Sequence, residues 1–213
     1  MHFFWKSILV AISLTLAVPR LLAQEDTQFR LLIHPTVDIA GVWFLPVWAI
    51  ATAAAASPDN ANLLTGIGFR GGSWWAEALT QRHWNAKGTH QWFLNFRLRK
   101  EFGAAGPDRG RMVFYLEPTM VLTQRGFAES AFWEYRLMDT PDSRLRPSFS
   151  VGAETENIQR GEKKQDTWGA GPRASYAFGS KRTRVVVAVT YQFRLREKDM
   201  LRVYLVLNLR HLK

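Results

Sequence analysis

The chain has 213 residues, a formal net charge of +10 and no cysteine. The missing cysteines exclude a disulfide framework and any thiolate chemistry. A basic chain invites a nucleic-acid function, but most of its arginines recur at every second position of predicted strands and do not gather in a phosphate-binding patch, so we expect no nucleic acid as a partner.

Residues 1–23 have the pattern of a signal peptide. Lys6 precedes the apolar run 8–18, and Leu21-Leu22-Ala23 offers a cleavage site. The 11-residue run is too short for a membrane-spanning helix, which needs about 20 residues. We therefore expect export through a cleaved signal peptide, and strands as the elements that would enter a membrane.

The next residues, 24–37, are expected to form an N-terminal arm, either mobile or a short strand, and residues 38–213 a β-barrel. Residues 38–54 are almost entirely apolar and are assigned to a first strand, although Pro46 would remove a ladder hydrogen bond. Gly71-Gly72 predicts a hairpin turn between the segments 63–70 and 73–84.

The later segments alternate apolar and polar residues with period two, which is typical of strands. In the last one, Leu201, Val203 and Leu205 alternate with Arg202 and Tyr204. The alternation predicts strands over residues 90–102, 111–124, 127–137, 146–156, 167–178, 182–196 and 199–213. With the earlier segments this predicts an antiparallel up-and-down barrel of ten strands, an even number with both chain ends on one side, or eight if two early segments merge or drop out.

From residue 91 on, charges can be sorted by parity, and they fall on one parity of these strands. The inward face is predicted to carry a charged network made of Arg97, Arg99, Glu117, Glu134, Arg136, Glu154, Glu156, Arg173, Arg194, Arg196, Arg202 and Arg210. The same parity holds Glu101, Arg111, Arg146 and Arg184. The outward face carries only Lys100, Glu129, Asp166 and Asp199, all near strand ends. Because a lysine or arginine facing lipid at mid-bilayer costs about 2–4 kcal/mol, this segregation indicates an apolar side toward lipid and a polar lumen.

Two interpretations of the lumen remain open. Arginine and glutamate pairs could fill it, or the surplus of arginines could line a narrow anion-binding or anion-conducting passage. At the barrel rim, the charged loop residues Arg160, Lys163 and Lys164 are either contacts to anionic lipopolysaccharide or solvated.

No catalytic constellation emerges. Residues 66–71 match the G-x-G-x-x-G fingerprint but lack its βαβ context, so these glycines are assigned to a strand and its turn. Ser73 and His83 share a strand face but would lie about 33 Å apart, beyond hydrogen-bond reach. His83 and His90 could approach across a hairpin, yet two histidines are too few for a metal site, and we expect neither metal nor cofactor.

On its alternation, turns and signal peptide, the chain resembles the small outer-membrane β-barrels of Gram-negative bacteria. The resemblance implies an outer-membrane location, with membrane lipids, lipopolysaccharide and the barrel-insertion machinery as partners. The C-terminal His211-Leu212-Lys213 departs from the usual aromatic terminus. The leading hypothesis is a non-enzymatic barrel, either a narrow transport component or a structural and surface-interaction protein. The alternatives are an acyl hydrolase or transferase using His83 or His90, and a secreted soluble lipid-binding barrel.

Overall fold

The structure, a computed structural model, describes residues 27–54, 57–85, 88, 90–103, 111–122, 126–140, 145–159, 167–180 and 182–211. The strands in chain order are β1 (Thr27–Ala40), β2 (Trp43–Ala54), β3 (Ser57–Gly71), β4 (Trp74–Asn85), β5 (His90–Phe102), β6 (Met112–Val121), β7 (Gly126–Asp139), β8 (Ser148–Gln159), β9 (Thr167–Gly179), β10 (Thr183–Leu195) and β11 (Met200–His211). No helix in this part of the chain is long and apolar enough to cross a membrane. The predicted signal peptide, residues 1–23, lies outside the described residues.

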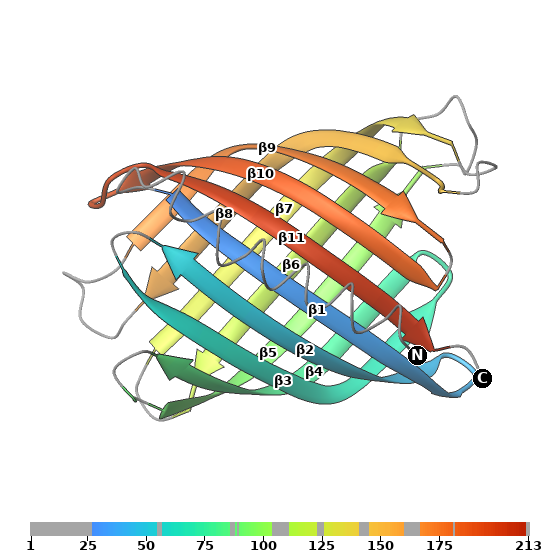
Figure 1. Cartoon of the computed structure of the whole chain (residues 1–213), viewed down its shortest axis with the longest axis horizontal. Coiled ribbons are helices and arrows are strands. Elements are labelled where there is room, and N and C mark those ends of the chain that lie inside the picture. Colours follow the sequence, from blue (N-terminus) through green and yellow to red (C-terminus); the bar gives the residue numbers. More distant parts are fainter. Residues whose placement is uncertain are drawn as a thin grey trace, which may run out of the picture.

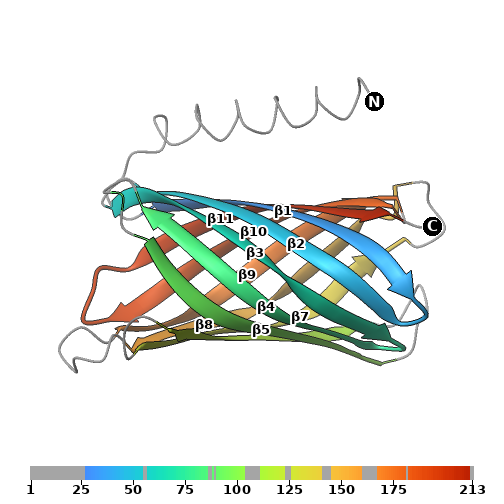
Figure 2. The same cartoon turned by 90° about the horizontal axis from the view of Figure 1, so that it is seen from below.

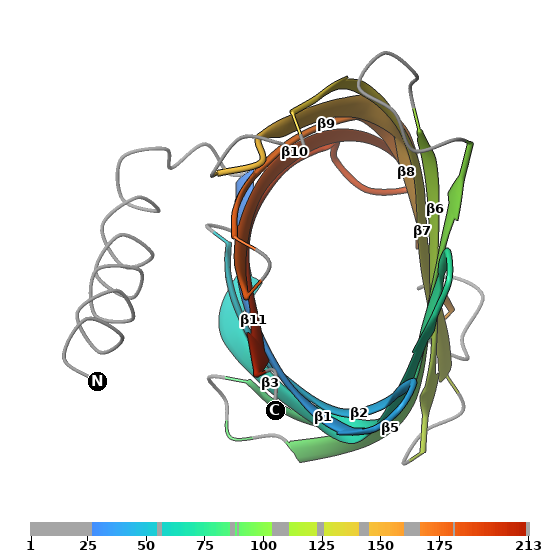
Figure 3. The same ribbon diagram turned by 90° about the vertical axis from the view of Figure 1, so that its right-hand side faces the viewer.

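The strands form one closed barrel, which confirms the all-β barrel prediction (Figures 1 and 3). Each strand pairs antiparallel with its neighbours along the chain, and the strands cross the barrel at a tilt (Figure 2). The closing pair, β1 and β11, is parallel, from Thr27 opposite Leu201 to Val37 opposite His211. Parallel closure follows from the odd number of strands, because the first and last then run in the same direction.

The prediction of ten strands with both ends on one side is wrong, since the described strands number eleven. The difference arises in the N-terminal region, where residues 27–37 form most of β1 and do not precede the barrel as an arm. The predicted first strand, 38–54, comprises the end of β1, a turn and β2. Gly41 makes this turn with a φ of +56°, which glycine adopts without strain.

The two ends of the barrel are therefore distinct. We call the end where β1 and β11 begin the N-terminal mouth, and the end where they finish the C-terminal mouth. The latter also holds the hairpin turns between β1 and β2 and between β3 and β4.

Side chains alternate between the barrel interior and its outer surface. On β10, Gln192 is 0 % exposed, whereas its neighbour Phe193 is 59 % exposed. Large apolar side chains cover the outer surface from strand to strand, among them Trp43, Leu45, Ile67, Phe96, Phe114, Trp133, Val189 and Phe193. Charged and polar side chains occupy much of the buried interior, so this barrel is polar inside and apolar outside.

Pro118, Pro172 and Pro46 lie within strands without shifting the register. Beside Pro118 the β5–β6 pairing skips two residue pairs, and beside Pro172 the β9–β10 pairing does the same. The residue offset is identical before and after each gap. Pro46 lies in a similar gap of the β2–β3 pairing, and Pro35 lies in a similar gap of the β1–β2 pairing. The loss of an N–H donor is thus absorbed locally, and none of these prolines marks a bulge.

Gly68 on β3 leaves room for the buried ring of Phe44. A Cβ at Gly68 would lie 2.2 Å from Phe44 Cζ. We expect Gly68→Val to lower the free energy of unfolding by about 1–3 kcal/mol, because the ring must leave its packed position. Urea unfolding monitored by tryptophan fluorescence measures this, with Ala78→Val on the outer surface as the matched control. Equal midpoints for the two variants would contradict the packing described.

Candidate functional site

Glu154 on β8 lies at the centre of a buried charge network. Its side chain is 1 % exposed. The carboxylate accepts hydrogen bonds from Arg173 Nη1 (2.5 Å), Thr190 Oγ1 (3.0 Å), Gln192 Nε2 (3.1 Å), Arg202 Nη1 (3.2 Å) and Tyr204 Oη (2.5 Å). Strand register sets this convergence, because Arg173, Thr190 and Arg202 lie in one row across β9, β10 and β11. Charge-assisted contacts of this kind satisfy a carboxylate that has no access to water.

Further pairs make this network electrically balanced. Arg202 Nη2 lies 2.7 Å from Glu156 Oε2, and Arg173 Nε lies 2.7 Å from Glu134 Oε1. Arg30 on β1 also reaches Glu156, at 3.4 Å. Three arginines and three glutamates thus form what we call the Glu154 network, with no excess of either charge. Because a buried ion is tolerated only when it is paired, the balance explains how these charges stay inside the barrel.

A second buried network surrounds Glu77 on β4. Glu77 Oε2 accepts a hydrogen bond from Trp48 Nε1 (2.7 Å), and Glu77 Oε1 lies 2.9 Å from His34 Nε2. The other ring nitrogen, His34 Nδ1, is 3.1 Å from Asn208 Oδ1. The His34 and Trp48 rings stack at 3.7 Å. We call these four residues the His34 network.

Arg97 on β5 joins the His34 network to Glu117 on the neighbouring strand β6. Its side chain is 1 % exposed, its guanidinium lies 4.1 Å from the Trp48 ring centroid, and Nη2 lies 2.9 Å from Glu117 Oε1. Glu117 also accepts a hydrogen bond from Tyr115 Oη at 2.6 Å. Both predicted network members, Arg97 and Glu117, therefore lie in the interior and contact each other.

Aromatic rings connect the two networks across the barrel. Tyr115 stacks on Trp75 and on Phe132, with ring centroids 6.4 and 4.8 Å away. The Arg173 guanidinium lies 4.3 Å from the Phe132 centroid, so the series ends in the Glu154 network. A series of contacts from Trp48 through Trp75, Tyr115 and Phe132 to Arg173 thus runs through the interior between the two networks.

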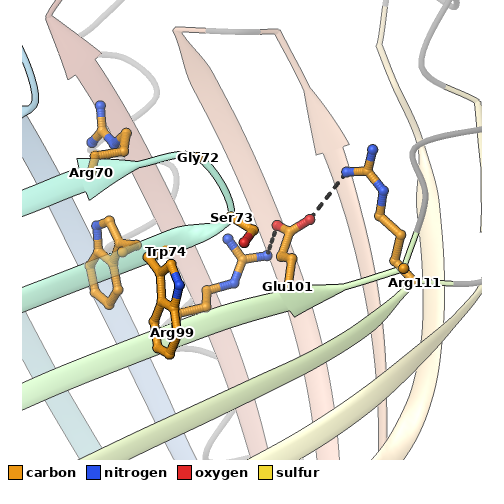
Figure 4. Close-up of a pocket in the computed structure, with 9 residues that line it drawn as sticks. Arg70, Gly72, Ser73, Trp74, Arg99, Glu101 and Arg111 are labelled. Atoms are coloured by element: carbon orange, nitrogen blue, oxygen red, sulfur yellow. Dashed lines mark hydrogen bonds and ion pairs between the residues drawn. The ribbon is translucent and has the colours of Figure 1, made fainter.

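The C-terminal mouth holds a third group of charges. Glu101 pairs with Arg99 (2.9 Å) and Arg111 (3.1 Å), as Figure 4 shows. Arg136 pairs with Asp139 at 2.9 Å. Two more arginines, Arg70 and Arg210, share Asp38, and Arg184 donates to Ser148 Oγ at 2.7 Å. A pocket of about 450 Å³ opens beside Arg99 and Glu101.

The remaining predicted residues lie toward the N-terminal mouth or outside the description. Arg194 ion-pairs with Glu197. Arg196 was expected to face the interior, but β10 ends at Leu195 and Arg196 lies exposed in the following turn, with a φ of +72°. The alternation that governs a strand no longer applies there. The predicted lipid contacts Arg160, Lys163 and Lys164 are outside the described residues.

Comparison with protein-family models, with curated proteins and with solved structures found no match. Within the described ranges, no group of three or more histidine, cysteine, aspartate or glutamate residues could hold a metal ion.

The residues first considered for catalysis are dispersed or engaged elsewhere. Ser73 precedes β4 at the C-terminal mouth, whereas His83 lies near the other end of that strand, where its Nδ1 is 2.8 Å from Asn62 Oδ1. The side chain of His90 is outside the description. The His34 and Glu77 side chains do form a close pair, but they are only 6 % and 0 % exposed. A substrate in solution cannot reach them.

The hydrogen bond from Trp48 to Glu77 offers a test of the His34 network. Trp48→Phe keeps an aromatic ring beside His34 and removes the donor. We expect a loss of about 1.5–3 kcal/mol in unfolding free energy, because the bond to a buried charged group is not replaced. Urea unfolding of the barrel in detergent measures it, with Trp133→Phe on the outer surface as control. A loss no larger than that of Trp133→Phe would show that the bond contributes nothing.

Several interior residues were missed by sequence reasoning, notably Arg30, His34, Asp38, Arg70 and Glu77. All precede residue 91, where the sorting of charges by parity began. A signal was available, because the polar residues Gln28, Arg30, His34, Thr36 and Asp38 all stand at even positions of β1.

Proposed function

We propose that this chain is an outer-membrane β-barrel that acts without enzymatic chemistry, as a structural or surface-interaction protein. The single observation that carries the proposal is the apolar outer surface, where side chains such as Trp133 and Val189 are 49 % and 40 % exposed. Soluble monomeric proteins rarely expose a contiguous apolar patch larger than a few hundred Å². Hydrocarbon is the solvent in which a barrel with this exterior is stable.

Charges on the outer surface support the same placement. The Arg82 guanidinium lies 5.2 and 5.5 Å from the ring centroids of Trp84 and Trp92, close to the N-terminal mouth. Lys100 Nζ lies 4.2 Å from the Trp74 centroid at the C-terminal mouth. Tryptophan and long basic side chains favour the boundary between lipid and water. Membrane lipids and lipopolysaccharide are the partners that such a surface would contact.

Between the two forms of the leading hypothesis, the interior favours an interaction protein over a transport component. The Glu154 network, the His34 network and the rings of Tyr115 and Phe132 occupy the middle of the barrel. Ions would have to displace paired, buried charges to pass this layer. The surface available to partners is then at the two mouths.

The two alternatives have less support. A soluble lipid-binding barrel needs an apolar interior and a polar exterior, and this barrel has the reverse. A lipid-modifying enzyme needs a histidine that substrate can reach beside a nucleophile, whereas His83 contacts the amide side chain of Asn62.

Fractionation of a Gram-negative host that expresses the full chain tests the proposal. We expect the protein in the outer-membrane fraction, resistant to extraction by urea without detergent, and with a mobility on gels that changes on boiling. Recovery from the soluble periplasmic fraction would overturn the membrane assignment.

A conductance measurement separates interaction from transport. Purified barrel in a planar lipid bilayer is expected to give no discrete current steps in potassium chloride, because a passing ion would have to displace the buried, paired charges of the Glu154 network. Reproducible steps that disappear when the protein is omitted would establish the transport function in its place.

A further inference from the structure

The positive charge of the interior is concentrated at the C-terminal mouth. Whereas the Glu154 network has equal numbers of arginines and glutamates, the ion pairs and hydrogen bonds described at this mouth involve six arginines and three acids: Arg70, Arg99, Arg111, Arg136, Arg184 and Arg210, and Asp38, Glu101 and Asp139. Arg184 lies within electrostatic reach of both Arg136 and Arg99. Like charges held together in this way cost free energy, and an anion bound among them would relieve it.

Part of this positive charge lines a pocket beside Glu101. Its volume of about 450 Å³ falls within the usual range for ligand pockets, about 300–1,000 Å³. Arg70, Arg99 and Arg111 line it against one acid, Glu101, and the side chains around it are drawn in Figure 4. Each contact with Glu101 engages one nitrogen of a guanidinium that carries five N–H donors. Arg99 is 40 % exposed, so part of this donor capacity faces water.

The pocket also has an aromatic and a hydroxyl component. Trp75 lines it and is held in place by Tyr115, at 6.4 Å between centroids, and by Trp48, also at 6.4 Å. Ser73 lines it at the β3–β4 turn. An indole packs well against the C–H face of a sugar ring, while hydroxyl and guanidinium groups bond its oxygens.

We propose that this pocket binds a soluble saccharide that carries a phosphate or carboxylate group. The arginines recognise the anionic group, and Trp75 and Ser73 recognise the sugar. The ligand is soluble because Arg99, Glu101 and Trp75 line the pocket from the interior face of their strands, and among the lining residues only Trp74 belongs to the exposed apolar surface. The inference rests on the proposed function, since it names what the interaction protein binds.

Titration of the full-length barrel in detergent micelles tests the proposal. The probes are glucose 6-phosphate, glucuronate, glucose and inorganic phosphate, with binding followed by calorimetry at low salt. We expect saturable binding of the two anionic sugars, with affinities at least about tenfold higher than those for glucose or inorganic phosphate. Equal affinity for phosphate and glucose 6-phosphate would reduce the pocket to a bare anion site and overturn the saccharide assignment.

Variants locate the site. Arg99→Gln is expected to weaken binding of glucose 6-phosphate by about tenfold or more, since it removes a charge-assisted contact. Glu101→Gln is expected to strengthen it, because the competing carboxylate is neutralised, and a misfolded variant could not produce that gain. Arg194→Gln, at the opposite mouth, is the matched control and leaves binding unchanged. Unchanged affinity in both Arg99→Gln and Glu101→Gln would overturn the site.

Three further results show whether this inference or the proposed function has failed. A barrel that resides in the outer membrane but binds neither anionic sugar overturns the inference alone. Binding that occurs only when lipopolysaccharide is supplied in nanodiscs, with no soluble probe bound, overturns the assignment to a soluble ligand. A chain found in the soluble fraction overturns the proposed function, whatever it binds.

Discussion

Arg202→Met is expected to lower the free energy of unfolding by about 3–5 kcal/mol, because it leaves Glu154 and Glu156 without their shared cation in a site closed to water. Arg202 is 1 % exposed and contacts both carboxylates, at 3.2 and 2.7 Å. Methionine keeps most of the side-chain volume, so the lost free energy of unfolding reflects the removed charge more than a change in packing. Reversible urea unfolding in detergent micelles or lipid vesicles measures it.

Arg210→Met is the matched control for this prediction. Arg210 lies on the same strand and face and pairs with Asp38, but it is 41 % exposed. An exposed ion pair contributes about 0–1 kcal/mol, so we expect a small change. Equal losses for Arg202→Met and Arg210→Met would show that burial of the Glu154 network does not govern its energy.

Val189→Arg is expected to destabilise the barrel in a lipid bilayer by about 2–4 kcal/mol, because the proposed placement puts this position in hydrocarbon. Val189 stands on the outer surface midway along β10, is 40 % exposed and pairs with Val203 on β11. The measurement is urea unfolding of barrels refolded into phosphatidylcholine vesicles, with folded and unfolded forms separated by gel mobility.

The same change at the rim supplies the comparison. Leu195, the last residue of β10, is 60 % exposed, and Leu195→Arg is expected to cost only about 0–1 kcal/mol near the lipid–water boundary. In a water-soluble barrel both positions would tolerate arginine equally. A cost for Val189→Arg no greater than that for Leu195→Arg therefore contradicts placement in a bilayer.

Alternation in the sequence predicted the seven strands from β5 to β11 because their two faces differ chemically, and the Gly71-Gly72 turn signal predicted β3 and β4. The N-terminal hairpin escaped this reasoning because β2 is apolar on both faces. Its inward residue Trp48 packs with Leu64 and Leu79 in an apolar cluster, while its outward residues form part of the exterior. Where both faces are apolar, period two disappears, and a single glycine at residue 41 was the only mark of the turn.

The sequence predicts which charged residues face the interior, but it does not predict which of them pair with one another. Parity places Glu154 and Arg173 on the interior face, yet Glu154 stands opposite Gly171 in the ladder and reaches Arg173 diagonally. Contacts between distant strands, such as Arg30 with Glu156, depend on the strand number and stagger of the closed barrel. The clustering of surplus arginines at one mouth depends on how far along the barrel axis each residue lies. Parity gives only the face of the strand, so it does not predict this position.

The central claim, that the apolar exterior faces hydrocarbon, is tested most directly by spin labels on β10. The chain has no cysteine, so single cysteines can be introduced at the outward positions Val185, Val187, Val189 and Tyr191, with Arg182 in the turn as reference. Barrels carrying a nitroxide are reconstituted into lipid vesicles, and relaxation by oxygen and by a water-soluble nickel complex is compared. We predict that relaxation by oxygen exceeds relaxation by the nickel complex most strongly at Val187 and Val189, and that relaxation by nickel is the larger at Arg182. Nickel access at Val187 and Val189 equal to that at Arg182 would contradict the account.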